Sequence, residues 1–251
     1  MEKNTTEKLK NIIEKEGACH LTLIDPDEQS PKESVKIAKE AEKAGTDGIM
    51  IGGSGVDQDA VRKTSKKIKE STDIPKIIFP GDTSSINKHA DAIFFMSLLN
   101  SRSRYWLSMA QAFGSFSVKK AGLEPIPLGY IILETSNKTS VEFYGDANVI
   151  PRDKHKITAA FALAAQYMGM EFAYLEGGSG AAEPVPNKMI GITKKTVDIP
   201  IIVGGGIRDK KTAAEKVKAG ADVIVTGTIA EEAENVEKKL KEIVKGTKVN
   251  K

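Results

Sequence analysis

The sequence is short of cysteine, of aromatic residues and of long apolar runs. Its 251 residues include a single cysteine, Cys19, which excludes an internal disulfide. Aromatic residues make up 6% of the chain, and no apolar run reaches the roughly 18 residues that a membrane-spanning helix needs. The N-terminal segment Met1–Lys10 is polar and does not resemble a signal peptide. We therefore expect a cytoplasmic protein without a membrane span.

Neither sign of charge dominates the chain. It has 37 basic and 34 acidic residues, and the formal net charge of +3 is too weak and too evenly spread to indicate a nucleic-acid partner. The three histidines, His20, His89 and His155, are too scattered to suggest a zinc site. With 40% hydrophobic and 28% charged residues, the composition is that of an ordinary globular protein.

Short apolar segments recur along the chain between longer amphipathic ones. Several are continuous apolar runs, as expected for parallel strands that are covered by helices. The predicted strands are Cys19–Ile24, Gly48–Ile51, Lys76–Phe79, Ala92–Met96, Leu128–Leu133, Phe172–Leu175, Pro200–Val203 and Val223–Val225. The clearest predicted helices are Pro31–Ala44, Gln58–Glu70, Arg104–Lys119, Lys154–Met168, Lys210–Ala219 and Glu231–Val244. This alternation predicts an α/β fold, a (βα)8 barrel of the TIM type, with residues 1–251 forming a single domain.

Two connections depart from the regular pattern. Pro80–Asp91, between the third and fourth strands, is too short for a helix with both its loops, so the third helix should be reduced to one turn or absent. Glu134–Asp153 is a long polar connection, which we expect to serve as a lid or binding element.

Glycines gather directly after the sixth, seventh and eighth predicted strands. In a βα-barrel the active site forms at the carboxyl ends of the strands, where bare backbone amides can surround a phosphate. The glycines could instead form only tight turns, but three clusters on adjacent strands favour a phosphate site. The expected phosphate-binding residues are Gly177, Gly178, Ser179, Gly180, Gly205, Gly206, Gly227 and Thr228.

The first two strands end in oxygen ligands, Asp25 and Ser54. This pair suits Mg²⁺, which accepts one or two protein oxygens and completes its shell with water and substrate phosphate. The alternative is that Asp25, which precedes Pro26, only caps a turn.

Glu176 ends the sixth strand beside the expected phosphate site, where burial would raise its pKa toward that of a useful general base. It could instead form an ion pair, for example with Arg208. Tyr174, two residues earlier on the same face, could hydrogen-bond the substrate or the base, or belong to the core. No lysine follows a strand at this edge, since Lys76 lies at the opposite end of its strand, which disfavours a Schiff-base aldolase.

The helical segment after the fourth strand is more apolar than one buried face requires. Its large residues include Tyr105, Trp106, Met109 and Phe113, which spread around more than one face. They could line a groove for a hydrocarbon ligand, form a subunit interface, or do both.

The strand-end motifs resemble those of the geranylgeranylglyceryl phosphate synthase family, whose bacterial relatives make heptaprenylglyceryl phosphate. The resemblance runs from about residue 18 to residue 235. The long connection Glu134–Asp153 and the Tyr105-Trp106 pair are similar to those of the family members with longer chains. The Tyr-Leu-Glu-x-Gly-Ser-Gly segment together with Asp-Pro-Asp is specific, whereas a triple glycine occurs in many phosphate-binding barrels. One departure is Gly177, where relatives often have alanine. The matching segments are Leu23–Asp27, Ile51–Ser54, Phe79–Gly81, Tyr174–Gly180, Val203–Arg208 and Thr226–Thr228.

The resemblance implies transfer of a C20 prenyl group from geranylgeranyl diphosphate to the 3-hydroxyl of sn-glycerol 1-phosphate. It implies that Asp25 and Ser54 bind Mg²⁺. It also implies that Glu176 takes the proton of the attacking hydroxyl, with Tyr174 as a second catalytic residue. It also implies a homo-oligomer, either a dimer or a hexamer. The glycerol phosphate would be held by Tyr174, Leu175, Glu176, Gly177, Gly178, Ser179, Gly180, Gly205, Gly206, Gly227 and Thr228.

Two other functions share some of these features. A barrel enzyme of amino-acid biosynthesis acting on another phosphate ester would share the glycines but would need neither the metal pair nor the apolar helix. A non-catalytic barrel scaffold would need no general base. Metal-dependent binding of a prenyl diphosphate separates the first alternative from prenyl transfer, and substitution of Glu176 separates the second.

Overall fold

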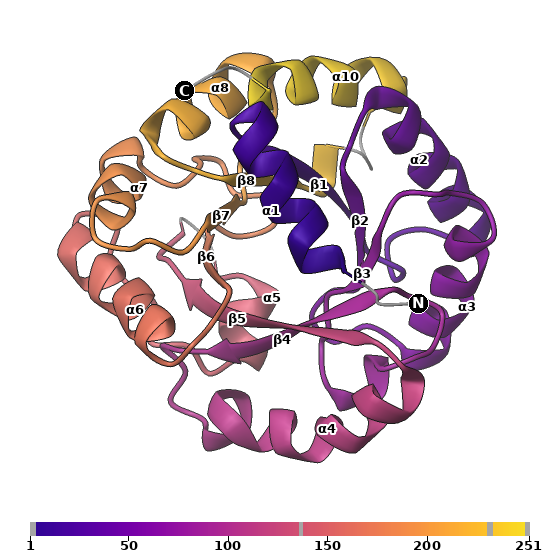
Figure 1. Cartoon of the computed structure of the whole chain (residues 1–251), viewed down its shortest axis with the longest axis horizontal. Helices are drawn as coiled ribbons and strands as arrows, with labels where there is room; N and C mark the ends of the chain where they lie inside the picture. The colour runs from indigo at the N-terminus through magenta and orange to yellow at the C-terminus, as the bar shows by residue number, and fades with distance from the viewer. Residues whose placement is uncertain (1–3, 136–137, 230–232, 249–251) are drawn as a thin grey trace.

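The computed structural model describes residues 4–135, 138–229 and 233–248. Parallel strands β1 to β8 form a closed barrel in sequence order, and β8 pairs with β1 to complete it. Helices surround the strands as an outer ring (Figure 1). The predicted (βα)8 barrel is therefore confirmed.

The strand bounds agree with the predicted ones to within a few residues. The strands are β1 (Cys19–Ile24), β2 (Gly48–Ile51), β3 (Lys76–Ile78), β4 (Ala92–Leu98), β5 (Glu124–Ile132), β6 (Phe172–Glu176), β7 (Ile201–Gly204) and β8 (Val223–Thr226). The largest difference is β5, which begins four residues before the predicted Leu128. Pro125 and Pro127 lie in this first part, and prolines argue against a strand in a sequence because they cannot donate a backbone hydrogen bond.

The helices follow the strands as predicted, with additions. They are α1 (Thr5–Glu16), α2 (Pro31–Ala44), α3 (Gln58–Lys69), a π-helix η2 (Tyr105–Met109) continued by α4 (Ala110–Ala121), α5 (Ser140–Tyr144), α6 (His155–Tyr167), α7 (Asn187–Lys194), α8 (Lys210–Ala219) and α10 (Val236–Thr247). Helix α10 begins at Val236, later than the predicted Glu231, and residues 231 and 232 lie outside the described residues.

Local signals in the sequence fix several of these helices. Ser30 and Glu33 form a reciprocal capping box at the start of α2, and Pro31 occupies its first position. Gly45 ends α2 with φ +91°, a left-handed conformation that turns the chain toward β2. Gly220 ends α8 in the same way before β8.

Helix α1 covers the amino ends of the strands. It lies across the centre of the ring in Figure 1, and Leu9 is fully buried in the barrel core. The carboxylate of Glu124, at the start of β5, accepts hydrogen bonds from Thr5 N (2.5 Å) and Thr6 N (3.0 Å). These bonds satisfy amide groups of the first turn that have no partner within the helix. The helix was not predicted, and it leaves the carboxyl ends of the strands as the face available to ligands.

The third βα unit lacks a full helix, as predicted. A single 3₁₀ turn, η1 (Thr83–Ser85), stands in its place. Ile86, which follows it, lies so close to α4 that a Cβ placed on Gly114 would be 3.0 Å from Ile86 Cδ1. Between α3, which packs against β3, and α4, which packs against β4, one short turn therefore takes the place of a helix.

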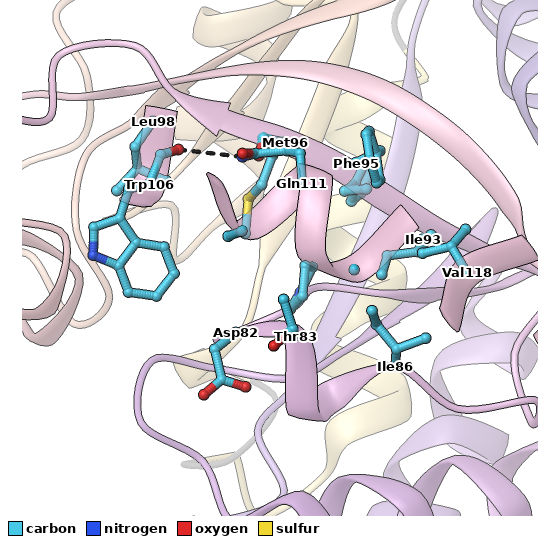
Figure 2. A pocket seen from close by; sticks show the side chains of 14 residues that line it. Asp82, Thr83, Ile86, Ile93, Phe95, Met96, Leu98, Trp106, Gln111 and Val118 are labelled. Atoms are coloured by element: carbon cyan, nitrogen blue, oxygen red, sulfur yellow. Dashed lines mark hydrogen bonds between the residues drawn. The ribbon is translucent and has the colours of Figure 1, made fainter. Parts of the chain in front are cut away.

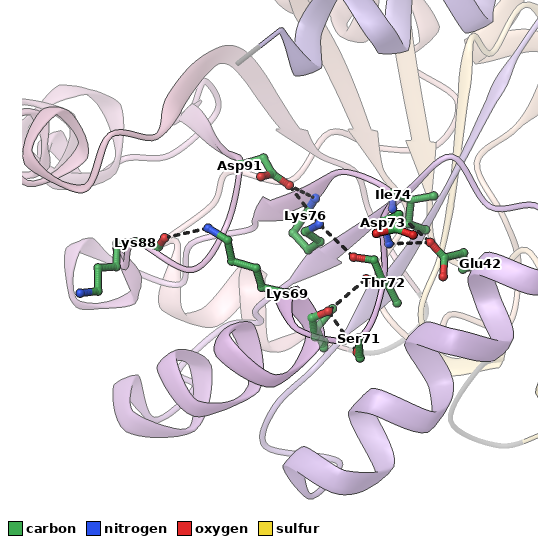
Figure 3. A network of polar contacts seen from close by, with 10 residues as sticks. Glu42, Lys69, Ser71, Thr72, Asp73, Ile74, Lys76, Lys88 and Asp91 are labelled. Atoms are coloured by element: carbon green, nitrogen blue, oxygen red, sulfur yellow. Dashed lines mark hydrogen bonds and ion pairs between the residues drawn. The ribbon is translucent and has the colours of Figure 1, made fainter. Parts of the chain in front are cut away.

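Lys76 lies at the amino end of β3, away from the carboxyl rim. Its side chain is buried, with Nζ 3.4 Å from an Asp91 carboxylate oxygen and 3.3 Å from the carbonyl oxygen of Thr72 (Figure 3). The ion pair and hydrogen bond compensate the cost of burying the charge. Lys76 is thus part of the structural support of the amino end.

Candidate active site

Glu176 is the last residue of β6, and its carboxylate is buried at the carboxyl rim. Oε1 accepts a hydrogen bond from Gly178 N at 2.6 Å, and Oε2 accepts one from the Tyr130 hydroxyl at 3.0 Å. Burial raises the pKa of Glu176 above its usual value, while the hydrogen bonds from Gly178, Tyr130 and Tyr174 oppose that rise. A carboxylate with a raised pKa and fixed geometry has the properties of a general base.

Two buried tyrosines support this carboxylate. Tyr130 on β5 and Tyr174 on β6 are register partners in the barrel, and their rings meet edge to face with centroids 5.1 Å apart. The Tyr174 hydroxyl lies over Gly204, where an added Cβ would be only 2.2 Å away. Tyr174 was predicted from the sequence and Tyr130 was not. The available signal was its position two residues before the end of β5, which matches that of Tyr174 before the end of β6.

The glycines after β6 and β7 bring two backbone segments into direct contact. A Cβ on Gly205 would lie 2.6 Å from the carbonyl carbon of Gly177, and one on Gly206 would lie 2.8 Å from Pro184 N. Gly205 and Gly206 also have positive φ, +89° and +70°. No other residue fits either position without strain. The close approach of the two loops therefore requires these glycines. The tight turns and a phosphate site are compatible with each other, because the same turns expose the backbone amides.

The expected phosphate-binding residues come together at this place. Gly177 N donates to Gly204 O at 2.9 Å, and the hydroxyls of Ser179 and Thr228 lie 3.3 Å apart, which joins the loops after β6 and β8. Gly178 and Gly180 have positive φ. A Cβ on Gly227 would only be in ordinary contact with the Leu23 side chain, at 3.5 Å. Leu175 packs among buried apolar residues, so it can offer only its backbone to a ligand.

Arg208 does not pair with Glu176. Its guanidinium donates to the carbonyl oxygens of Ala181 (2.8 Å) and Gly180 (3.1 Å) in the loop after β6. The ion pair that the sequence left open as an alternative for Glu176 is therefore not formed, and the carboxylate keeps only neutral hydrogen-bond donors.

Asp25 and Ser54 lie at the ends of adjacent strands, β1 and β2. The Asp25 carboxylate lies against Gly53, where an added Cβ would be 2.1 Å from Oδ2, and its Oδ1 accepts a hydrogen bond from Asp27 N at 3.0 Å. Burial raises the pKa of Asp25 above its usual value. Asp25 therefore does cap a turn, as the simpler alternative held, but its second oxygen points toward the loop that carries Ser54.

Two clefts lie beside this point. The first is lined by Ser54, Tyr130, Val141, Tyr144 and other residues around them. The second is mainly apolar and lies between η1 and α4 (Figure 2). Both clefts are lined by Pro80, Met96, Leu98 and Trp106, so they adjoin each other between Ser54 and the flank of α4.

Of the four residues that the sequence suggested for an apolar groove, Trp106 is the one that lines these clefts. Its indole Nε1 donates to Tyr144 O at 2.7 Å, which ties η2 to α5 of the long connection. Tyr105 packs edge to face against Trp106. Met109 and Phe113 do not line either cleft, and their side chains are 42% and 64% exposed. The excess of apolar residues thus divides into an inner face along the cleft and an outer face.

The π-helix η2 has its own polar support. Ser97 Oγ donates to Leu107 O at 2.8 Å, and Gln111 Nε2 donates to Trp106 O at 3.2 Å (Figure 2). Single π-turns of this kind occur often at functional sites because they displace side chains from the regular helical position. Here the displaced turn carries Trp106, at the junction of the two clefts.

Within the residues that the structure describes, no group of three or more His, Cys, Asp or Glu side chains could hold a metal ion. The same part of the chain contains no helix that is both long enough and apolar enough to cross a membrane. A cation at Asp25 and Ser54 would therefore need further oxygen ligands from water or substrate.

Comparison with known proteins gives consistent matches. The model of the PcrB family matches residues 10–247. The chain is 50% identical over 234 residues to geranylgeranylglyceryl phosphate synthase of Methanothermobacter thermautotrophicus, covering 93% of this chain and 95% of that protein. It is 52% identical over 233 residues to the enzyme of the same name from Thermococcus kodakarensis, covering 91% and 92%.

The structure is also similar to a solved one. The crystal structure of (S)-3-O-geranylgeranylglyceryl phosphate synthase from Thermoplasma acidophilum, in complex with sn-glycerol-1-phosphate, superposes with a TM-score of 0.90. The two sequences are 43% identical, and the match covers 96% of this chain and 98% of that one.

Proposed function

The chain belongs to the PcrB family, and on this basis we propose that it transfers a geranylgeranyl group from geranylgeranyl diphosphate to the 3-hydroxyl of sn-glycerol 1-phosphate. The products are an ether-linked prenylglyceryl phosphate and diphosphate, as in ether phospholipid biosynthesis. The observation that carries the proposal is that two unlike sites lie side by side. The buried carboxylate of Glu176, beside the glycine loops, accepts a hydrogen bond from Tyr130, and Tyr130 also lines the cleft at Ser54, which adjoins the apolar cleft beside α4.

The glycine loops after β6, β7 and β8 would hold the phosphate of the acceptor. Backbone amides and the facing hydroxyls of Ser179 and Thr228 supply donors at fixed positions. Loops built by direct backbone contact cannot relax away from the ligand, which orients the glycerol before reaction. Catalysis gains from this because the acceptor hydroxyl is presented to the prenyl carbon in one geometry.

Glu176 would take the proton of the attacking hydroxyl. Its raised pKa gives the carboxylate a higher proton affinity, which suits a base. Tyr130 and Gly178 N hold the carboxylate oxygens Oε2 and Oε1 in place. The acceptor oxygen then forms a bond to the prenyl carbon as the carbon–oxygen bond to diphosphate breaks. A general base contributes about 10²–10⁴-fold to such a reaction.

Asp25 and Ser54 fit a Mg²⁺ ion that is shared with the diphosphate. Asp25 is partly buried, its pKa is raised by that burial, and it forms no ion pair with a basic side chain among the described residues. A nearby cation would offset the free-energy cost of ionising this buried carboxylate. When bound, Mg²⁺ would supply positive charge to the departing diphosphate. The remaining ligands would be water and diphosphate oxygens.

The apolar cleft between η1 and α4 would accept the prenyl tail. Burial of half of a C20 chain contributes on the order of 8 kcal/mol before ordering costs, at about 0.8 kcal/mol per CH₂. Because the third helix is reduced to η1, this tail can lie against the outer wall of the barrel while its diphosphate stays near Ser54.

The protein would assemble as a homo-oligomer, a dimer or a hexamer. Several large apolar side chains are exposed on α4, α5 and α6, including Phe116 (83%) and Tyr167 (78%). Exposed apolar residues that gather in a patch are typical of subunit contacts. Light scattering at several protein concentrations measures the mass directly, and a monomer throughout would contradict this part of the proposal.

The central test is an incubation with glycerol 1-phosphate and prenyl diphosphates of several lengths, with and without Mg²⁺, analysed by mass spectrometry. We expect a geranylgeranyl ether that forms only with metal. Glu176→Gln should lower the rate about 10²-fold while glycerol phosphate binding survives. The matched control is Glu215→Gln, an exposed change on α8, which should leave the rate unchanged. No metal-dependent diphosphate binding by the wild-type protein would sink the proposal.

A further inference from the structure

The loop after β6, residues 177–186, contains no helix or strand, yet its backbone is held from outside by two arginines. Arg208, in the connection from β7 to α8, donates from Nη1 to Ala181 O (2.8 Å) and from Nη2 to Gly180 O (3.1 Å). Arg152, in the connection from β5 to α6, donates from Nη2 to Pro184 O (2.7 Å). Each arginine joins this loop to a neighbouring one.

The two arginines differ in charge balance. Arg152 lies 3.5 Å from the carboxylate of Glu183, which offsets its charge. Arg208 has no carboxylate within ion-pair distance among the described residues, and its two hydrogen bonds go to neutral carbonyl groups. The positive charge of Arg208 is therefore not neutralised by the protein, although it lies directly behind the loop that carries Gly178, Ser179 and Gly180.

The two carbonyls that Arg208 holds belong to successive residues, and the planar guanidinium fork fits such a pair. A carbonyl oxygen that turned toward a phosphate would repel it. With both oxygens engaged by Arg208, the negative ends of these two peptide dipoles point toward the guanidinium group. The positive φ of Gly180, +68°, allows the chain to adopt this turn.

We propose that Arg208 is a positioning residue for the acceptor phosphate. It keeps the Gly180 and Ala181 carbonyl groups turned out of the site and adds a positive charge behind the amide groups that face in. This role rests on the proposed function, in which the same loop holds glycerol phosphate. Arg208 does not touch the reacting hydroxyl, so it should act on acceptor binding and leave the chemical step unchanged.

The test compares Arg208→Gln, Arg208→Lys and Arg152→Gln by steady-state kinetics. Arg208→Gln should raise KM for glycerol 1-phosphate about tenfold or more, because charge-assisted contacts are lost, with little change in kcat or in KM for the prenyl diphosphate. Arg208→Lys keeps the charge without the fork and should recover part of the loss. Arg152→Gln is the matched control, since it anchors the same loop with a charge that is already paired.

A purely structural role would give a different result. In that case Arg208→Gln and Arg152→Gln would change KM, kcat and the melting temperature together, and the proposal would be overturned. It would equally be overturned if Arg208→Gln left KM for the acceptor within about twofold of wild type, a change too small for the loss of a charge-assisted contact.

A second measurement separates this proposal from the transferase activity. Inorganic phosphate should raise the melting temperature of the wild-type protein, and this shift should be smaller for Arg208→Gln than for Arg152→Gln. If the protein transfers no prenyl group but shows these shifts, the proposed function fails and the phosphate site with Arg208 stands. If transfer occurs but phosphate protects all variants equally, the role of Arg208 fails alone.

Discussion

The two sides of the carboxyl rim are built from different parts of the chain. On the side of β6 to β8, backbone contacts backbone: a Cβ on Gly205 would lie 2.6 Å from Gly177, and Arg208 fixes two carbonyl groups. On the side of β3 and β4, side chains surround open space. There a Cβ on Gly114 would meet side-chain atoms and no backbone, Ile86 Cδ1 at 3.0 Å and Thr83 Cγ2 at 3.4 Å.

The difference suits what each side would bind under the proposed function. A phosphate needs donors at fixed angles, and only a rigid backbone supplies them at no cost at the moment of binding. An apolar tail is attracted by buried area, which has no direction, so a cleft of adaptable side chains suffices. Substitutions should therefore act in an all-or-none way on the first side and in a graded way on the second.

The largest effect is expected for Gly205→Ala. The new methyl group would overlap the Gly177 backbone, and alanine at φ +89° is itself strained. We expect a loss of about 3 kcal/mol in the free energy of unfolding. The displaced loop should lower kcat/KM for glycerol phosphate about 10²-fold. Urea unfolding and initial rates measure the two effects.

Gly122→Ala is the control for this change. Gly122 also has positive φ, +63°, but nothing lies within 4 Å of the added methyl group. This variant should lose only about 1 kcal/mol in the free energy of unfolding, from backbone strain, and its transfer activity should be normal. If both variants behave alike, close contact between the loops is not what makes the acceptor side rigid.

Tyr130→Phe should change the pH dependence of the rate. The base acts when Glu176 is ionised, so kcat/KM rises with pH through the pKa of this group. The Tyr130 hydroxyl stabilises the ionised form, and its removal should raise the already elevated pKa further. The acid limb should move to higher pH, with a rate loss of about tenfold on that limb and recovery above it.

The control here is Tyr167→Phe, because Tyr167 is largely exposed at the end of α6 that leads into the amino end of β6, away from the carboxyl rim. Its pH–rate profile should coincide with that of the wild-type protein. An unshifted acid limb in Tyr130→Phe would mean that Glu176 is not the base whose ionisation limits the rate.

A smaller and more selective effect is expected for Gly114→Leu. The side chain would project into the cleft between η1 and α4 beside Ile86. Use of a C20 donor should fall about tenfold relative to a C10 donor, with KM for glycerol phosphate unchanged. Gly114→Ala should be nearly neutral because a favourable helix propensity of about 1 kcal/mol offsets the close contact. If the rate fell equally with the C20 and C10 donors, the prenyl tail would not lie in the cleft between η1 and α4.

The smallest effect is expected for Phe113→Ser. Phe113 lies on the outer face of α4 and does not line either cleft. Transfer rates should stay within about twofold of wild type, as for other exposed positions. Light scattering then shows whether the same change lowers the mass of the assembly. A strong loss of transfer activity without a change in the mass of the assembly would indicate that the prenyl tail binds at the outer face of α4.

The fold and the gathering of the glycine loops could be predicted because their signals are local. The glycines lie at the ends of strands β6, β7 and β8, as in Gly205 and Gly206 after β7. The carboxyl ends of all eight strands share one rim, so order along the chain gives proximity in space.

The parts that were missed depend on tertiary contacts. Tyr130 sits among apolar residues of β5 and looks like any core tyrosine until its partner Glu176 is placed beside it. Helix α1 has few apolar residues. Asn4 caps its start locally, but two amides of its first turn are bound by Glu124, more than a hundred residues away. Phe113 and Trp106 have the same apolar character in sequence, and only the π-turn and packing decide which one faces the cleft.

The missing third helix has a consequence for how such enzymes arise. Shortening one βα unit to the turn η1 bares a strip of the barrel wall and leaves every glycine of the rim in place. A barrel that binds a small phosphate ester can therefore accommodate a long apolar substrate when one helix is shortened, without change to its glycine loops. Grafting a full helix into residues 80–91 is the reverse operation, and it would fill the space for the apolar substrate while leaving the phosphate site in place.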